Sequence, residues 1–291
     1  MSKSLRLRLW DFLKEKKTLM EIYEAFEEKD STIRGRLNEN IGVCFKRLGR
    51  GIYIATDGDV QAIIINGDTW EVLDDLEESS IDCIIMDSPY GVLDQQMSWG
   101  TTRKRNLNGG WKFETKDLDE AIYGKLLRIL KPGGHMFSFM PSSKRDTHEY
   151  IENQIQLAKK SGWTFNSQWI WDKKMMGMGY NGRSRHELIH FFSKGKRRLH
   201  GKGHAMRRTP DVQAHSREHW RWAIHETQKP IELIAAIIEF STLPNEVVLD
   251  PFGGSCSTAA AALQTGRNSI CIEIDRAMVR KACALTEHGK F

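Results

Sequence analysis

The sequence predicts an α/β protein with a doubly wound, mostly parallel sheet, preceded by a small separate unit. From residue 60 onward, short apolar runs rich in β-branched residues alternate with helical stretches. These runs are apolar at nearly every position, as is typical of strands that are buried on both faces. Two of them end in acidic residues and turns, at the strand ends where such sheets bind ligands.

The first 57 residues favour a unit of their own, because short helical patterns are followed by a hairpin signal with a basic tip, Gly49-Arg-Gly51. Three helices and a hairpin resemble a winged helix-turn-helix, a module that contacts DNA in some proteins and other proteins elsewhere. The helices are expected at 5–13, 19–26 and 31–37, and the strands at 43–48 and 52–55.

Residues 58–291 are expected to form the main domain. No internal repeat is visible in them. Strands are expected at 60–65, 81–86, 135–140, 188–192, 246–249 and 269–272, and helices at 117–130, 147–161, 230–241, 257–265 and 275–287.

The composition, with 40% apolar and 28% charged residues, is that of a globular protein and excludes collagen, low-complexity disorder and a coiled-coil rod. Five scattered cysteines without a CxxC pair indicate reduced thiols and a cytoplasmic location. Charges interrupt the apolar residues at the start of the chain, and no apolar run approaches the length of a membrane span. We therefore expect a protein that is neither exported nor membrane-spanning.

Positive charge is concentrated in residues 172–226, which hold 13 Lys and Arg against 5 Asp and Glu, together with seven of the ten histidines. Clustered Lys and Arg commonly neutralise phosphates, so this segment favours a surface that faces a polyanion. A solvated basic loop is the alternative.

The strand expected at 246–249 leads into Asp250-Pro-Phe-Gly-Gly-Ser255, where glycines let a ligand approach the backbone. Glu273 ends the next strand, 20 residues after Gly253, a spacing at which a carboxylate accepts hydrogen bonds from ribose hydroxyls. Neither GxGxxG nor GxxxxGK[ST] is present. The pattern predicts a nucleoside-like ligand that need not carry phosphate, with a purely structural turn as the alternative.

A second strand, 81–86, places Asp87-Ser88-Pro89-Tyr90 at its carboxyl end. A carboxylate, a backbone carbonyl and a flat aromatic ring suit a planar substrate that bears an NH2 group. The alternative is a plain turn after a strand.

Asp-Ser-Pro-Tyr closely resembles the Asp-Pro-Pro-Tyr motif of amino-group DNA methyltransferases, and the Asp250 turn resembles their S-adenosylmethionine loop. Residues 65–68, 130–137, 171–187 and 227–233 are similar to further motifs of this family, in the order of its beta class. The resemblance implies a Rossmann-like methyltransferase domain. It assigns catalysis to Asp87, Ser88, Pro89 and Tyr90, and cofactor binding to Asp68, Gln228, Lys229, Pro230, Asp250, Phe252, Gly253, Gly254, Ser255 and Glu273.

The same resemblance implies double-stranded DNA as the partner and places a target-recognition region at about 195–225. It leaves open a homodimer, a companion restriction endonuclease, and a bacterial or phage-infected cell as the setting. The DNA-binding residues expected from charge and position are Arg183, Arg185, Lys194, Lys196, Arg197, Arg198, Lys202, Arg207 and Arg208.

The leading Asp87 favours the N6 amino group of adenine in a base flipped out of the duplex. Cytosine-N4 methylation is the alternative, because Ser88 stands where the family motif has proline. A nonenzymatic DNA-binding regulator is a third alternative. No cysteine follows a proline, so the nucleophile expected for cytosine-C5 methylation is missing.

The histidine pairs His200–His204 and His215–His219 have the spacing of zinc ligands on a helix. Glycines between the first pair disfavour a helix, and no thiol is near. We therefore expect no metal site.

Overall fold

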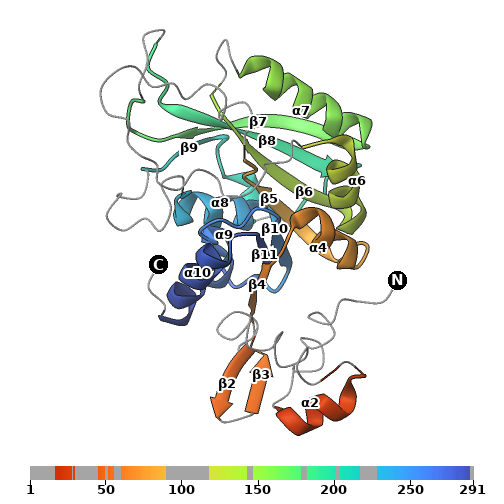
Figure 1. Cartoon of the computed structure of the whole chain (residues 1–291). Helices are drawn as coiled ribbons and strands as arrows, with labels where there is room; N and C mark the ends of the chain where they lie inside the picture. Colours follow the sequence, from red (N-terminus) through yellow and green to blue (C-terminus); the bar gives the residue numbers. More distant parts are fainter. Residues whose placement is uncertain are drawn as a thin grey trace, which may run out of the picture.

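The structure, a computed structural model, consists of a main α/β body and a small N-terminal sheet (Figure 1). It describes residues 17–27, 29, 45–49, 52–55, 60–89, 118–142, 147–177, 182–200, 204–216 and 228–288.

The body is built on one eight-stranded sheet within the described residues. All neighbouring strands pair in parallel except β8, which is antiparallel to β6 and β7. This arrangement confirms the predicted doubly wound, mostly parallel sheet. Across the sheet the strands are β4 (Ala62–Asn66), β11 (Asn268–Glu273), β10 (Val247–Asp250), β5 (Ile81–Met86), β6 (Leu130–Met140), β8 (His186–Lys194), β7 (Trp163–Asp172) and β9 (Val212–Ala214).

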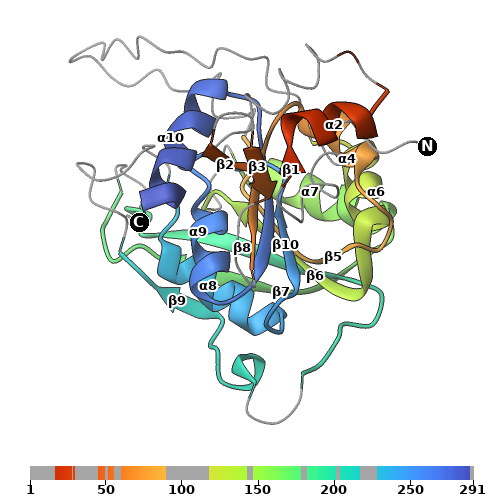
Figure 2. The same cartoon turned by 90° about the horizontal axis from the view of Figure 1, so that it is seen from below.

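Helices cover both faces of this sheet, as Figures 1 and 2 show. One face carries α4 (Thr69–Asp75), α6 (Glu120–Ile129) and α7 (His148–Lys160), and the other carries α8 (Ile231–Ser241) and α9 (Ser257–Gln264). The last helix, α10 (Arg276–His288), packs against β4 and β11. A short 3-10 helix, η1 (Ala205–Arg207), lies against α8.

The core fills both sides of the sheet because the central strands are apolar on both faces, and β5 is buried at every position. On the α8 side, aromatic rings from three strands and a helix interlock. Phe137 stacks on Phe191 with ring centroids 4.7 Å apart, and Phe240 meets Trp169 edge-on at 4.7 Å. Such packing fixes the strands on which the site residues stand.

Strand β7 was not predicted. Its aromatic residues Trp163, Phe165 and Trp169 are separated by polar residues, and only Trp163, Trp169 and Trp171 are fully buried. This alternation is typical of a strand whose faces differ, whereas the prediction rested on continuous apolar runs. The short elements β9 and α4 were also not predicted, and β6 begins at Leu130, five residues earlier than expected.

The N-terminal sheet pairs β1 (Lys17–Thr18) and β2 (Phe45–Gly49) with the central β3 (Ile52–Ala55). The hairpin of β2 and β3 and the helix α2 (Leu19–Ala25) lie where the sequence predicts them. The helices expected at 5–13 and 31–37 lie outside the described residues. The winged helix-turn-helix therefore stays a prediction.

In the part of the chain that the structure describes, no helix combines the length and apolarity of a membrane span. The four cysteines described, Cys83, Cys256, Cys271 and Cys283, are buried and form no disulfide with one another.

Candidate active site

The two strand ends singled out in the sequence lie next to each other. Strand β5 pairs with β10 in parallel, with Val248 opposite Cys83 and Leu249 opposite Ile84. Asp87 directly follows β5 and Asp250 ends β10, so both lie at the edge where the parallel strands end. We call this the carboxyl edge and the opposite one the amino edge. In doubly wound sheets, ligands bind at the carboxyl edge where the strand order reverses.

The turn after β10 is shaped by Asp250. Its Oδ1 accepts a hydrogen bond from the backbone N–H of Phe252 at 3.1 Å, and its Oδ2 accepts one from the Thr258 hydroxyl at 2.6 Å. The carboxylate thus joins the end of the strand, the glycine turn and the start of α9. This geometry gives Asp250 a part in forming the turn, besides any contact with a ligand.

Glu273, at the end of β11, ties the glycine turn to the neighbouring strand. Its Oε2 accepts from the Gly254 N–H at 2.7 Å, and its Oε1 accepts from the Asp275 N–H at 2.7 Å. Gly254 has φ of +50°, in the left-handed region where a side chain is strained. The sequence reasoning correctly anticipated that Glu273 stands beside this turn.

Asp68 comes to the same edge from β4. Its carboxylate caps α4 by accepting from the Trp70 N–H at 2.9 Å, and the Gly67 N–H donates to the Glu273 carbonyl at 3.1 Å. The Trp70 ring meets Phe252 edge-on, with centroids 5.8 Å apart. The expected cofactor residues Asp68, Asp250, Phe252, Gly253, Gly254, Ser255 and Glu273 are therefore brought together by three adjacent strands.

Burial raises the pKa of Asp250 to about 7, against the hydrogen bonds from Thr258 and Phe252, which act in the opposite direction. The folded protein thus keeps this carboxyl protonated at pH values where the unfolded chain has lost the proton. The contribution of the Asp250 carboxyl to the free energy of unfolding is fully present below about pH 4 and is lost as the pH rises toward 7.

Between about pH 4 and pH 7, we expect the free energy of unfolding to fall less in Asp250→Asn than in the wild type, because the amide does not titrate. Urea unfolding at both pH values measures this difference. The exposed variant Asp74→Asn is the control, and equal declines in wild type and Asp250→Asn would count against the assignment.

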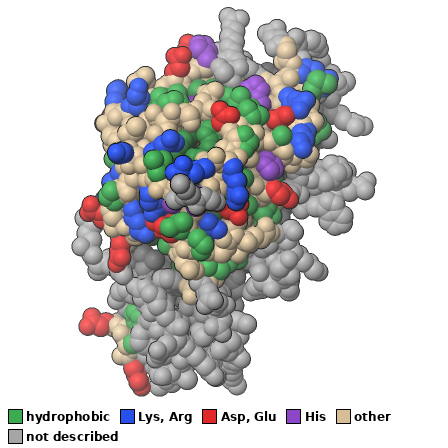
Figure 3. All heavy atoms as spheres, turned by 180° about the vertical axis from the view of Figure 1, so that it is seen from behind, with side chains coloured by type: hydrophobic (Ala, Val, Ile, Leu, Met, Phe, Trp, Pro, Cys, Tyr) green, Lys and Arg blue, Asp and Glu red, His purple; other side chains and the backbone are tan. Residues whose placement is uncertain are grey.

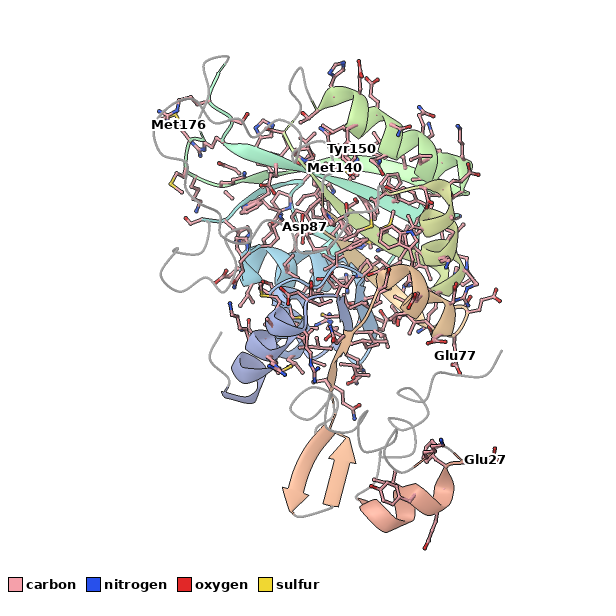
Figure 4. All side chains as sticks on the ribbon, in the orientation of Figure 1. Glu27, Glu77, Asp87, Met140, Tyr150 and Met176 are labelled. Carbon is pink, nitrogen blue, oxygen red and sulfur yellow. The ribbon has the colours of Figure 1, made fainter. Side chains whose placement is uncertain are left out.

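Asp87 lies near the middle of the body in the view of Figure 4, directly after β5, whose Met86 pairs with Ser138 of β6. Its Oδ2 forms an ion pair with Lys229 Nζ at 2.6 Å. Ser88 is buried, and its hydroxyl has no hydrogen-bond partner among the described residues. Pro89 follows, and Tyr90 lies outside the described residues.

Gln228, Lys229 and Pro230 lead into α8, and the Pro230 carbonyl accepts from the Ile234 N–H at 3.2 Å. The ion pair brings this segment to the end of β5. Sequence reasoning missed Lys229 as a partner of Asp87, and it also missed Glu187, whose Oε1 pairs with Lys173 at 2.7 Å. The motif Arg185-His-Glu187 was the only signal for Glu187.

Part of the predicted DNA-binding set lies at the amino edge, opposite Asp87. Lys194 Nζ donates to the Leu130 carbonyl at 2.8 Å, at the start of β6. Arg198 forms a bidentate pair with Glu246, just before β10, and lies 3.4 Å from Asp82 at the start of β5. These contacts bind the ends of three strands together and indicate a structural role.

The remaining members of that set are distributed differently. Arg183 and Arg185 stand between β7 and β8 at the carboxyl edge, where Arg185 pairs with Asp172 at 2.6 Å. Arg207 and Arg208 belong to η1 and its end, Lys196 and Arg197 are exposed, and Lys202 lies outside the described residues. On the face drawn in Figure 3, Lys and Arg side chains are interspersed with Asp and Glu.

We expect Arg198→Met to lower the free energy of unfolding by about 2 kcal/mol, because it leaves Glu246 and the buried Asp82 with one cation fewer. Denaturant unfolding measures the change. Arg197→Met, at the exposed neighbouring position, is expected to leave stability unchanged. An equal loss in both variants would contradict the structural role of Arg198.

His200 and His204 lie side by side, with ring centroids 4.0 Å apart. The Nε2 of His200 is 3.1 Å from the Ser241 carbonyl, and that of His204 is 3.0 Å from the Thr242 carbonyl. Both rings thus bind carbonyl groups at the end of α8. Among the described residues, no group of three or more His, Cys, Asp or Glu side chains is arranged to hold a metal.

The sequence is similar to proteins that are named as methylases. It shares 29% identity with the Escherichia coli methylase YubD over 72% of this chain and 83% of the relative. The DNA adenine methyltransferase YhdJ of Escherichia coli is 25% identical over 77% of this chain and 82% of its own length.

Two solved structures share the fold. The M1.HpyAVI–SAM complex superposes with a TM-score of 0.52 at 22% identity, covering 77% of this chain and 97% of that chain. The cytosine-N4-specific PvuII DNA methyltransferase superposes with a TM-score of 0.57 at 16% identity, covering 77% of this chain and 87% of that chain.

The profile of the DNA methylase family N6_N4_Mtase matches residues 81–284, which include both strand ends described above. This match spans most of the chain and confirms the resemblance carried by the Asp87 and Asp250 motifs. The chain therefore belongs to the N6/N4 family of DNA methylases, whose members methylate amino groups of bases.

Proposed function

We propose that this DNA methyltransferase transfers a methyl group from S-adenosylmethionine to the N6 amino group of adenine. One observation carries the proposal: the Asp87 carboxylate stands at the end of β5, next to the strand β10 that leads into the Asp250 turn. A hydrogen-bond acceptor for an amine and a nucleoside-binding turn thus occupy neighbouring positions at one edge of the sheet.

The residues at this edge fit the cofactor. The Glu273 carboxylate beside the glycine turn suits the ribose hydroxyls, and Asp68 suits the amino group of the adenine ring. A Cβ at position 253 would lie 3.3 Å from Cys256 Sγ and from the Ile272 carbonyl, and Gly254 has φ of +50°, so this tight turn requires glycine at both positions. When bound, S-adenosylmethionine supplies an electrophilic methyl group on a sulfonium. A solved neighbour of the same fold is named as a complex with SAM.

The chemical task of the chain is to make a base amine nucleophilic, because the ring withdraws the lone pair of the exocyclic nitrogen. Asp87 and the Ser88 carbonyl accept hydrogen bonds from the two N–H groups of the amine, which directs its lone pair toward the methyl group. Transfer would break the carbon–sulfur bond, whose electron pair would stay on the sulfur of a neutral thioether, and would form a nitrogen–carbon bond. The nitrogen would give up one proton to the Asp87 carboxylate and from there to solvent. The carboxylate stabilises the positive charge that develops on the nitrogen.

The target base cannot reach the end of a strand while it is stacked in a duplex, so it is flipped out. Tyr90, directly after Pro89, is proposed to stack on the extruded ring. We propose that the duplex approaches the carboxyl edge, where Arg183 and Arg185 stand between β7 and β8. Lys194 and Arg198, at the amino edge, are proposed to serve the fold.

Residues 1–57 are proposed to form a separate unit beside the methyltransferase domain at 58–291. The cytoplasmic location, the homodimer and the companion endonuclease stay predictions. Each follows from the family resemblance or the composition and not from a contact within the described residues.

Long-read sequencing of host DNA after expression of the chain tests the proposal, since it reports the modified base and its sequence context together. We expect N6-methyladenine at a defined site, and none after expression of Asp87→Ala. N4-methylcytosine would transfer the assignment to cytosine, the base named for the PvuII enzyme. No modified base in DNA would contradict the proposed function.

A further inference from the structure

The lysine ahead of α8 has its charged end in the catalytic site. Lys229 Nζ lies 2.6 Å from Asp87 Oδ2 and 3.5 Å from Glu187 Oε2, and its side chain is only 10% exposed. A buried ammonium between two carboxylates is costly to assemble and is retained only with close partners. The sequence resemblance placed Lys229 beside the cofactor, whereas the structure places its ammonium on Asp87.

Several elements hold this ammonium in place. The ring of Phe139, from β6, lies 5.1 Å from it, and the ring of Trp171, from β7, lies 5.9 Å away. Glu187, from β8, is in turn fixed by Lys173 at 2.7 Å. The result is a row of alternating charges, Asp87, Lys229, Glu187 and Lys173, which crosses the carboxyl edge from β5 to β7.

The ammonium stays charged in this position. Burial alone would lower the pKa of Lys229, but the carboxylates of Asp87 and Glu187 raise it above its ordinary value. The pair also closes a long distance in the chain, since residues 87 and 229 are separated by 142 positions. It therefore ties the catalytic strand end to the segment before α8.

We propose that Lys229 is a positioning residue for methyl transfer: its ammonium fixes the orientation of the Asp87 carboxylate that receives the target amine. Asp87 directly follows the last residue of β5. The ion pair with Lys229 restrains its carboxylate and places a positive charge beside it. Misplacement of a reacting group by about 1 Å can cost about 100-fold in rate.

This inference rests on the proposed function, and its test separates binding from turnover. Lys229→Met keeps the length of the side chain and its packing on Phe139 and Trp171, but removes the charge. We expect kcat for DNA methylation to fall about 100-fold, while the calorimetric Kd for S-adenosylmethionine changes by less than about threefold, within the scatter of neutral substitutions. Lys229→Arg restores part of kcat, because it restores the charge.

A second measurement needs neither cofactor nor DNA. The stabilities of Asp87→Asn, Lys229→Met and the double variant are compared by urea unfolding. The ion pair predicts that the double variant loses less stability than the two single variants together. The exposed pair Asp74–Lys125 is the matched control, with little coupling expected in Asp74→Asn and Lys125→Met.

The outcomes distinguish the two proposals. A wild-type protein that methylates no DNA contradicts the proposed function before any variant is compared. With an active wild type, an unchanged kcat in Lys229→Met overturns the positioning role. A more than tenfold weaker Kd for S-adenosylmethionine with kcat retained also overturns it, and returns Lys229 to the cofactor site.

Discussion

We expect Asp87→Ala to lower kcat for DNA methylation by at least about 10³-fold, because the variant has no side-chain acceptor for the amine and none for its developing charge. The Kd for S-adenosylmethionine stays close to that of the wild type, since the cofactor turn is formed by Asp250 and Glu273 on neighbouring strands. Steady-state kinetics on duplex DNA and calorimetric titration measure the two quantities separately.

The fold of Asp87→Ala must be intact for this comparison. Lys229 loses a partner in the variant but keeps Glu187 at 3.5 Å, so circular dichroism and urea unfolding accompany the kinetics. Asp74→Ala, an exposed aspartate on α4, is the control and retains full turnover. Turnover of Asp87→Ala within tenfold of the wild type would contradict the catalytic role.

The second large effect is expected for Glu273→Ala, on cofactor affinity rather than on turnover. Hydrogen bonds to a charged group contribute about 1.5–3 kcal/mol each, so loss of two ribose contacts weakens binding by about 100-fold or more. The variant also releases the Gly254 N–H, which Glu273 holds at 2.7 Å. Calorimetric titration with S-adenosylmethionine measures the affinity.

Glu273→Gln separates the two contributions, because it keeps an acceptor but removes the charge. We expect its affinity to lie between those of the wild type and Glu273→Ala. Glu239→Gln, exposed on α8, is the control and leaves the affinity unchanged. Wild-type affinity in Glu273→Ala would remove this residue from the cofactor site.

The strands of the sheet were predicted best where they are buried on both faces and therefore apolar at nearly every position. The run at 81–86 is apolar at nearly every position and forms β5 with the same bounds. Helices α6 to α10 begin and end within three residues of the expected bounds, because the spacing of their apolar residues marks them. Strand β7 was not predicted from its alternating aromatic residues, because the strands and helices packed against it decide which of its side chains are buried.

The site shows the same division. Asp87, Asp250 and Glu273 lie at one edge, as predicted, because the topology of a parallel sheet gathers strand ends there, and their roles stay predictions. The pairing of Lys229 with Asp87 could not be read from residues 142 positions apart. Lys194 and Arg198, which are predicted DNA contacts, bind Leu130, Asp82 and Glu246 at the amino edge, and these distant partners could not be predicted from a count of charges.

Single-turnover transfer tests the central claim most directly: S-adenosylmethionine labelled in its methyl group is bound to excess protein, mixed with duplex DNA, and the DNA is digested to nucleosides. We expect the label on the N6 nitrogen of deoxyadenosine with the wild type, and on the cofactor with Asp87→Ala. Label on the amino nitrogen or a ring carbon of cytosine, or no label in DNA, would contradict this expectation.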